Sequence, residues 1–189
     1  MAEHPVFQAV RQRRTVYRFR SQEIAPEVLS ELLEAATNAP NHRHTEPWRF
    51  VVVRGAALSR LADLRVELQM ERSARDGKPP GDLDALRREV TQARTIVYVI
   101  QHLDADEKRQ REDYASCAIC AYILQLTAWE RGIGARWHTG QLVASRKVRP
   151  LLGLADDEEP ICYLALGYPD EEPKPWRKKT AQELTRYVE

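Results

Sequence analysis

The sequence has 189 residues, of which 43% are hydrophobic and 30% charged, and its formal net charge is +1. These values describe a globular protein of one domain that is long enough to bury a sizeable core. A net charge this close to zero gives no reason to expect nucleic acid or a membrane surface as a partner.

No targeting or membrane-spanning segment is apparent in the sequence. Residues 1–14 lack the apolar centre of a signal peptide, and no apolar run approaches the roughly 18 residues of a transmembrane helix. The three cysteines, Cys117, Cys120 and Cys162, suggest no disulfide framework. We therefore expect a cytoplasmic protein.

Helical patterns alternate with a few short apolar strands along the chain. Leu29, Leu32 and Leu33 recur at helical spacing after Pro26, a residue that favours the first turn of a helix. The pattern favours an α+β or α/β fold in which helices cover a small sheet, as one domain over 1–189. The predicted helices are 5–14, 26–38, 58–68, 84–92, 106–131 and 145–153, and the predicted strands are 49–53, 95–100, 135–139 and 161–166.

Two polar segments are expected to lie outside the core. Residues 71–84 form a charged run that several glycines and prolines interrupt, which predicts a mobile excursion and a candidate lid. Residues 169–189 form a basic, proline-rich tail that is too polar to build a core of its own. Such a tail is either disordered or lies across a partner surface.

The helix predicted over 106–131 is apolar around most of its circumference. Such a helix is buried in a core or in an oligomer interface. It contains Cys117 and Cys120 in a Cys-x-x-Cys pattern, but without the strand and turn that accompany a redox motif. Buried apolar packing is therefore the expected role of both thiols.

The stretch TNAPNHRHTEPWRF, residues 37–50, is the strongest candidate for a ligand site. It connects a periodic helix to an apolar strand, and its prolines restrict the backbone. Asn41, His42, His44 and Glu46 supply hydrogen-bond donors and acceptors, and an amide such as that of Asn41 suits a planar heterocycle. An ordinary polar connection between a helix and a strand is the alternative.

A second candidate is the cluster Arg11-Gln12-Arg13-Arg14-Thr15 after the first predicted helix. Arginines at a helix end are favoured by its negative dipole, and such a cluster is often a solvated surface. Guanidinium groups also match phosphate oxygens in a bidentate way. Both interpretations remain open from these residues alone.

Together these motifs resemble the nitroreductase family of flavoenzymes over nearly the whole chain, and its compact NAD(P)H nitroreductase branch in particular. The shared features are an Arg-Arg-Thr after the first helix, an Ala-Pro loop followed by Pro-Trp-x-Phe, a Gly-x-Gly after the long helix, a short strand with a tryptophan, Leu-Gly-Tyr-Pro after the last strand and Pro-x-Arg in the tail. The resemblance implies an α+β intertwined homodimer with FMN at each of two subunit interfaces. It also implies that the long helix forms much of the interface and that the tail extends onto the partner.

The resemblance further implies roles for particular residues. Arg13 and Arg177 match positions near the FMN phosphate, and Arg14 and Thr15 match positions near the phosphate, the ribityl chain or the ring edge. Relatives often carry Arg or Lys at the position of Tyr17, whereas here the basic residue is Arg18. The positions that match the loop over or beside the flavin are Asn38, Pro40, Asn41, His42 and His44, and the strand that meets the flavin contains Trp137, His138 and Thr139.

The implied activity is transfer of a hydride from NAD(P)H through flavin N5 to a small oxidised acceptor, such as a nitroaromatic or a quinone. The cofactor performs this chemistry, so no side chain is named as an obligatory acid or base. One alternative is a flavin-binding protein of the same fold with specialised chemistry or a sensing role. A distant alternative is a metal-binding module that uses His42, His44 and the cysteines.

Overall fold

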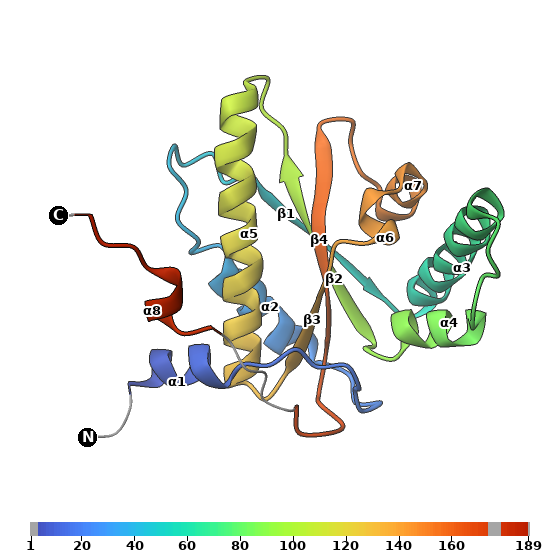
Figure 1. The fold of residues 1–189 in the computed structure, drawn as a ribbon, viewed down its shortest axis with the longest axis horizontal. Coiled ribbons are helices and arrows are strands. Elements are labelled where there is room, and N and C mark those ends of the chain that lie inside the picture. The colour runs from blue at the N-terminus through green and yellow to red at the C-terminus, as the bar shows by residue number, and fades with distance from the viewer. Residues whose placement is uncertain (1–3, 174–178, 189) are drawn as a thin grey trace.

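The computed structural model describes residues 4–173 and 179–188. Its centre is a four-stranded antiparallel sheet with the strand order β1-β2-β4-β3 (Figure 1). The strands are β1 (Trp48–Arg54), β2 (Thr95–His102), β3 (Gly134–His138) and β4 (Glu158–Gly167). Each overlaps a predicted strand, so the expectation of a small sheet in an α+β fold is confirmed.

The two central strands are buried on both faces, which explains why their sequences are continuously apolar. On β2, Val97 and Val99 belong to one core cluster, whereas Ile96 and Tyr98 belong to the other. β4 divides its side chains between the clusters in the same way. The sheet therefore separates two apolar layers.

Helices cover both of these layers (Figure 1). α2 (Pro26–Ala36) and α5 (Glu107–Glu130) pack on one face, and α3 (Ala56–Asp76), α4 (Leu83–Thr91), α6 (Gln141–Ala144) and α7 (Arg149–Leu152) lie on the other. The remaining elements are α1 (Pro5–Gln12), the 3-10 turn η1 (Arg146–Val148) and α8 (Ala181–Leu184). Within the described part of the chain, none of the helices combines the length and the hydropathy needed to cross a membrane.

The long helix appears as predicted, but its own chain does not cover it completely. Cys117, Cys120 and Leu124 are fully buried in the core beneath α5. Tyr114 and Tyr122 on the same helix remain 50% and 36% exposed. One stripe of α5 is therefore available to another molecule.

The segment 71–84 is more regular than the irregular excursion that the sequence predicts. Residues 71–76 continue α3, which ends at Gly77 in a left-handed conformation with φ of 63°. α4 starts after Asp82, whose side chain accepts a hydrogen bond from a first-turn amide. The glycines and prolines all lie in the short connection between the helices, so they end one helix rather than interrupt the whole segment. Mobility of that connection, and a lid role for it, stay predictions.

β1 also differs from its expected environment. It lies at the edge of the sheet and, among the described strands, pairs with β2 alone. The run from Arg49 to Val53 shows little alternation, which predicts a strand covered on both faces. Val52 is 39% exposed and Arg49 is exposed, so that prediction is wrong for the single chain. A valine-rich run indicates a β-strand. It does not distinguish an edge strand from a central one, because valine is enriched in both.

The segment after α1 forms an arm, defined as residues 13–20, along the β3 edge of the sheet. Thr15 forms a parallel bridge with Ala135, and the Val16 amide donates to the Ala135 carbonyl at 3.2 Å. Gly134 allows this approach, because a Cβ at Gly134 would lie 2.3 Å from a methyl group of Val16. The arm is therefore placed by the start of β3.

Candidate functional site

Arg13 is the predicted site residue that has a buried side-chain donor without a partner in the described part of the chain; Arg109 Nε on α5 is the other such atom. Its Nε is buried and has no hydrogen-bond partner within the described residues. The guanidinium carbon lies 5.7 Å from the ring centroid of Tyr122 on α5, a cation–π contact that holds the side chain. A buried donor left without an acceptor is unfavourable, so this group fits an anion such as a phosphate.

The neighbouring arm residues play different parts. The Arg14 guanidinium donates to the backbone carbonyl groups of Arg11 and Arg13, so it closes the end of α1. Thr15 is exposed and lines a cavity of about 360 Å³ with other arm residues and residues 171–173. The structure thus leaves Arg13 and Thr15 available to a ligand, whereas part of Arg14 is engaged. Arg177 lies outside the described residues.

The end of β3 sends its side chains to opposite faces of the sheet. Trp137 packs against the core cluster beneath α5. The His138 ring stacks on Tyr163 of the other cluster, with centroids 4.5 Å apart and an interplanar angle of 11°. Thr139 follows and is exposed. These three predicted residues are adjacent, but Trp137 and His138 do not point toward the same space.

His138 is held in its neutral form. Burial, together with the charges of the nearby Arg136 and Arg65 guanidinium groups, lowers the pKa of its imidazole from 6.5 to about 4. A neutral imidazole stacked on a tyrosine is a packing and hydrogen-bonding group at neutral pH. His138 is therefore not a source of protons for a reaction at neutral pH.

This depressed pKa makes a prediction about stability. Between pH 6.5 and about 4 the unfolded chain binds a proton on this histidine and the folded chain does not, so stability falls as the pH falls through that window. We expect His138→Gln to reduce the pH dependence of the free energy of unfolding, measured by urea titration, by about 1 kcal/mol across this window. This value is discounted because the ring is partly exposed. The exposed His42→Gln serves as the comparison. An unchanged slope in the His138 variant would contradict the assignment.

The loop 37–46 is tied to its own chain more tightly than expected. The Asn38 amide donates to the carbonyl groups of Glu34 and Ala35, which closes the end of α2. The Asn41 amide donates to Asp113 Oδ1 at 3.2 Å, and its carbonyl oxygen accepts the Glu46 amide at 2.9 Å. The Asn41 side chain is therefore engaged within its own chain in this conformation, and its contact with a planar ligand stays a prediction.

Other loop side chains remain free to meet a ligand. Pro40, His42 and His44 are all exposed. His44 and Glu46 adopt left-handed backbone conformations, with φ of 53° and 44°. Such conformations are unfavourable for residues other than glycine and are found where the surroundings enforce them.

One chain does not bring its two groups of predicted residues together. The loop 37–46 leads into β1 at one edge of the sheet, whereas the arm and Trp137–Thr139 lie at the β3 edge. Both groups contact α5, but the loop contacts Asp113 near its start and Arg13 contacts Tyr122 more than two turns later. Figure 1 shows the same separation along α5.

The cysteines do not form a metal or redox centre with the histidines. Burial raises the pKa of Cys117 and Cys120 to about 12, so both remain protonated thiols. His42 and His44 are exposed on the loop, whereas the three cysteines are buried. In residues 4–173 and 179–188, no group of three or more His, Cys, Asp or Glu side chains could hold a metal ion.

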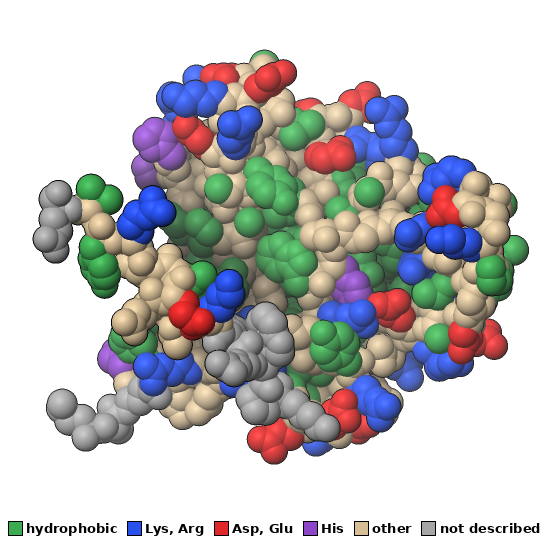
Figure 2. All heavy atoms as spheres, in the orientation of Figure 1, with side chains coloured by type: hydrophobic (Ala, Val, Ile, Leu, Met, Phe, Trp, Pro, Cys, Tyr) green, Lys and Arg blue, Asp and Glu red, His purple; other side chains and the backbone are tan. Residues whose placement is uncertain are grey.

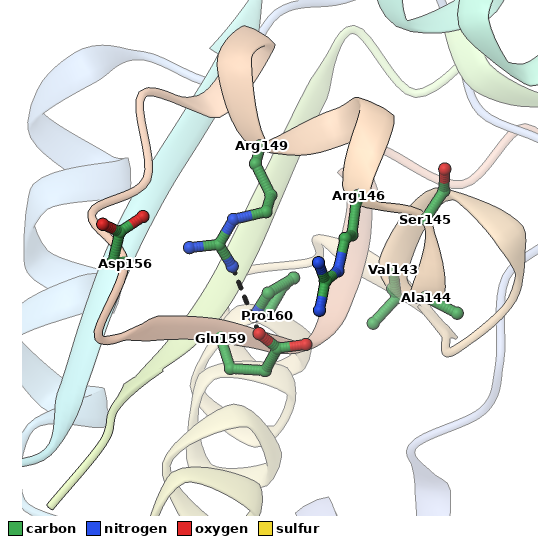
Figure 3. A pocket seen from close by; sticks show the side chains of 8 residues that line it. All are labelled: Val143, Ala144, Ser145, Arg146, Arg149, Asp156, Glu159 and Pro160. Carbon is green, nitrogen blue, oxygen red and sulfur yellow. Dashed lines mark hydrogen bonds and ion pairs between the residues drawn. The ribbon is translucent and has the colours of Figure 1, made fainter.

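A second cavity, of about 310 Å³, lies between α6, α7 and the start of β4 (Figure 3). Arg149 occupies it and donates to Glu159 Oε2 at 3.2 Å and to the Glu158 carbonyl at 2.8 Å. Its guanidinium therefore ties α7 to β4. None of the predicted site residues lines this cavity.

Two residues near the candidate site escaped sequence reasoning. Arg136 on β3 forms an ion pair with Glu89 at 2.8 Å and lies 4.9 Å from the ring centroid of Tyr17. Asp113 on α5 anchors the loop. Nothing in the sequence singles out Asp113, because residues 107–113 are all charged or polar and include two other acidic residues. The sequence also contains no signal for the pairing of Arg136 with Glu89.

Comparison with known proteins agrees with this arrangement. The chain matches the model of the Nitroreductase family over residues 10–168. It is 29% identical over 165 residues to a protein of Bacillus subtilis named "Putative NAD(P)H nitroreductase YfhC", which covers 87% of this chain and 84% of that protein.

Solved structures show the same fold. A nitroreductase-like protein from Bacillus cereus superimposes with a TM-score of 0.86 at 27% identity, covering 100% of this chain and 98% of the other. A nitroreductase of Desulfovibrio desulfuricans, solved in complex with FMN, superimposes with a TM-score of 0.75 at 22% identity, covering 99% of each chain. With the family model matched over most of its length, this chain belongs to the nitroreductase family.

Proposed function

We propose that the protein is an FMN-dependent oxidoreductase that uses NAD(P)H to reduce a small oxidised acceptor, such as a nitroaromatic or a quinone. The observation that carries the proposal is the buried Nε of Arg13, which has no hydrogen-bond partner within the described residues. A phosphate-bearing ligand would supply the missing acceptor. The name of the B. subtilis relative supports the choice of NAD(P)H, and the FMN complex of the D. desulfuricans protein supports the choice of FMN.

In this proposal the residues of the chain bind and orient, and the cofactor supplies the redox chemistry. Arg13 would hold the phosphate together with Arg177, and the exposed Thr15 hydroxyl would donate a further hydrogen bond. The backbone at the end of β3 would border the ring, and Trp137 would keep that strand fixed against the core. When bound, FMN would accept a hydride from NAD(P)H at N5 and pass two electrons to the acceptor.

A homodimer is part of the proposal, because a single chain leaves apolar surface uncovered and separates its site residues. Val6 and Phe7 on α1 are each 62% exposed, Ile119 on α5 is 40% exposed and Tyr187 in the tail is 83% exposed. Figure 2 shows apolar side chains gathered on this face of the molecule. A second copy packed here would cover them and bring its own loop 37–46 to the arm and β3 of the first.

The proposal predicts a yellow protein with a flavin absorption spectrum that bleaches when NADPH or NADH is added without oxygen. The measurement is the visible spectrum of the purified protein before and after anaerobic addition, with reoxidation by a quinone as the second step. The cofactor released by heating should match FMN in chromatographic mobility.

Two other outcomes would redirect this proposal. A flavin that binds but resists reduction by either nicotinamide would favour a protein of the same fold with specialised chemistry or a sensing role. A colourless protein that fails to bind added FMN would overturn the assignment.

A further inference from the structure

Asp113 is a buried carboxylate with no cationic partner. Only 4% of its surface is exposed, and no arginine, lysine or histidine among the described residues forms an ion pair with it. Burial of a carboxylate without a counter-ion is unfavourable, and an apolar side chain at this position would be tolerated better. Its presence therefore requires compensating hydrogen bonds.

Those hydrogen bonds all come from the loop 37–46. The Thr45 hydroxyl donates to Asp113 Oδ1 at 2.7 Å, and the Asn41 amide donates to the same oxygen at 3.2 Å. The Asn41 amide also lies 3.4 Å from the Ser116 hydroxyl, one turn further along α5. The restraint extends to Glu46, because the side-chain oxygen of Asn41 accepts a hydrogen bond from the Glu46 backbone amide at 2.9 Å.

The conformation fixed in this way is strained. His44 and Glu46 have φ of 53° and 44°, in the left-handed region that side chains disfavour. Strained residues persist only where the surroundings determine them. The contacts of Asp113 with Thr45 and Asn41 join this loop to α5, and Arg49 also donates to the Glu46 carbonyl at 2.8 Å. The result is a loop whose polar side chains, including His42, stay exposed rather than collapse onto α5.

We propose that Asp113 is a positioning residue, which holds the loop 37–46 of one subunit in the conformation that meets the flavin bound by Arg13 of the partner copy. The inference rests on the proposed function. It draws on the sheet order, since the loop leads into β1 and the arm of the same chain lies along β3, at the opposite edge of the sheet.

The test compares Asp113→Ala with Asp113→Asn, which keeps an acceptor oxygen for Thr45. We expect the alanine variant to remain a folded dimer by light scattering and thermal unfolding, but to bind FMN at least about tenfold more weakly, a loss comparable to one good hydrogen bond. The asparagine variant should recover most of this affinity. Glu130→Ala, an exposed carboxylate at the far end of α5, is the matched control.

Subunit mixing tests the placement across the interface. Asp113→Ala subunits mixed with Arg13→Ala subunits should regain wild-type affinity at one site of each heterodimer, because that site combines the intact arm of one with the intact loop of the other. Mixtures that show no recovery would overturn the proposal, as would unchanged FMN affinity in Asp113→Ala.

Hydrogen exchange of the Glu46 amide separates this proposal from the function on which it rests. We expect faster exchange in Asp113→Ala even without flavin, since the chain from Asp113 through Asn41 to that amide is broken. Faster exchange in a protein that never binds FMN would leave the loop restraint standing and overturn the flavin assignment. Unchanged exchange would overturn the restraint itself.

Discussion

Replacing Arg13 by alanine is expected to weaken FMN binding at least about a hundredfold, or roughly 2.7 kcal/mol, as the loss of a bidentate, charge-assisted contact predicts. The reason lies in the structure of the side chain. Tyr122 orients the guanidinium, and Nε has no acceptor within the described residues. A double variant with Arg177→Ala should lose nearly all affinity, since both proposed phosphate ligands are then missing.

The same variant makes an opposite prediction for the protein without cofactor. Because Arg13 brings a buried, unsatisfied donor, its removal should leave the thermal stability of the apoprotein unchanged or raise it. Only the stabilisation that added FMN provides should disappear. A residue that merely supported the fold would behave in the reverse way.

Fluorescence titration of FMN and thermal unfolding with and without FMN make both measurements. Arg60→Ala is a suitable control, because Arg60 is an exposed arginine on α3. Unchanged FMN affinity in the Arg13 and Arg177 double variant would show that the phosphate is held elsewhere.

Replacing Gly134 by alanine is expected to destabilise the protein by about 2 kcal/mol, which corresponds to a fall in melting temperature of about 4–8 °C. A Cβ at this position would lie 2.3 and 2.7 Å from Val16 side-chain atoms. Val16 is buried, with 1% of its surface exposed, so moving its side chain would disturb the packing around it. The arm would have to shift away from β3.

A displaced arm should also affect ligand binding. Arg13 and Thr15 precede Val16 directly, and Thr15 bridges to Ala135 beside the substituted glycine. We therefore expect FMN affinity to fall together with stability in Gly134→Ala. Gly140→Ala is the comparison for stability alone, since no atom lies within 4 Å of a Cβ there. Equal melting temperatures for the two variants would show that the contact with Val16 is easily relieved.

Much of the fold follows from local patterns in the sequence. The apolar runs of β2 and β4 indicate buried strands, and Ser145 and Gly153 mark the ends of a helical segment, which the structure divides into η1 and α7. The error in 71–84 has a local cause as well. The prediction treats the glycines and prolines as interrupting all of 71–84. In the structure, residues 71–76 continue α3, and the glycines and prolines follow its end.

The candidate site divides differently between sequence and structure. The motifs around Arg13, Asn41 and Trp137 are legible in order along the chain, and they lead to the family. The spatial arrangement of these motifs cannot be read from the sequence. Whether Asn41 faces a ligand or its own helix depends on Asp113, which lies 72 residues away.

The sequence by itself determined the helices, the central strands and the membership of the nitroreductase family, because periodicity, caps and motifs act over a few neighbouring residues. Tertiary structure alone decided the contact of Gly134 with Val16, the opposite facing of Trp137 and His138 and the isolation of Arg13 Nε. It also placed the loop and the arm at opposite edges of the sheet. These features depend on which distant segments pack together, and no local rule specifies that packing.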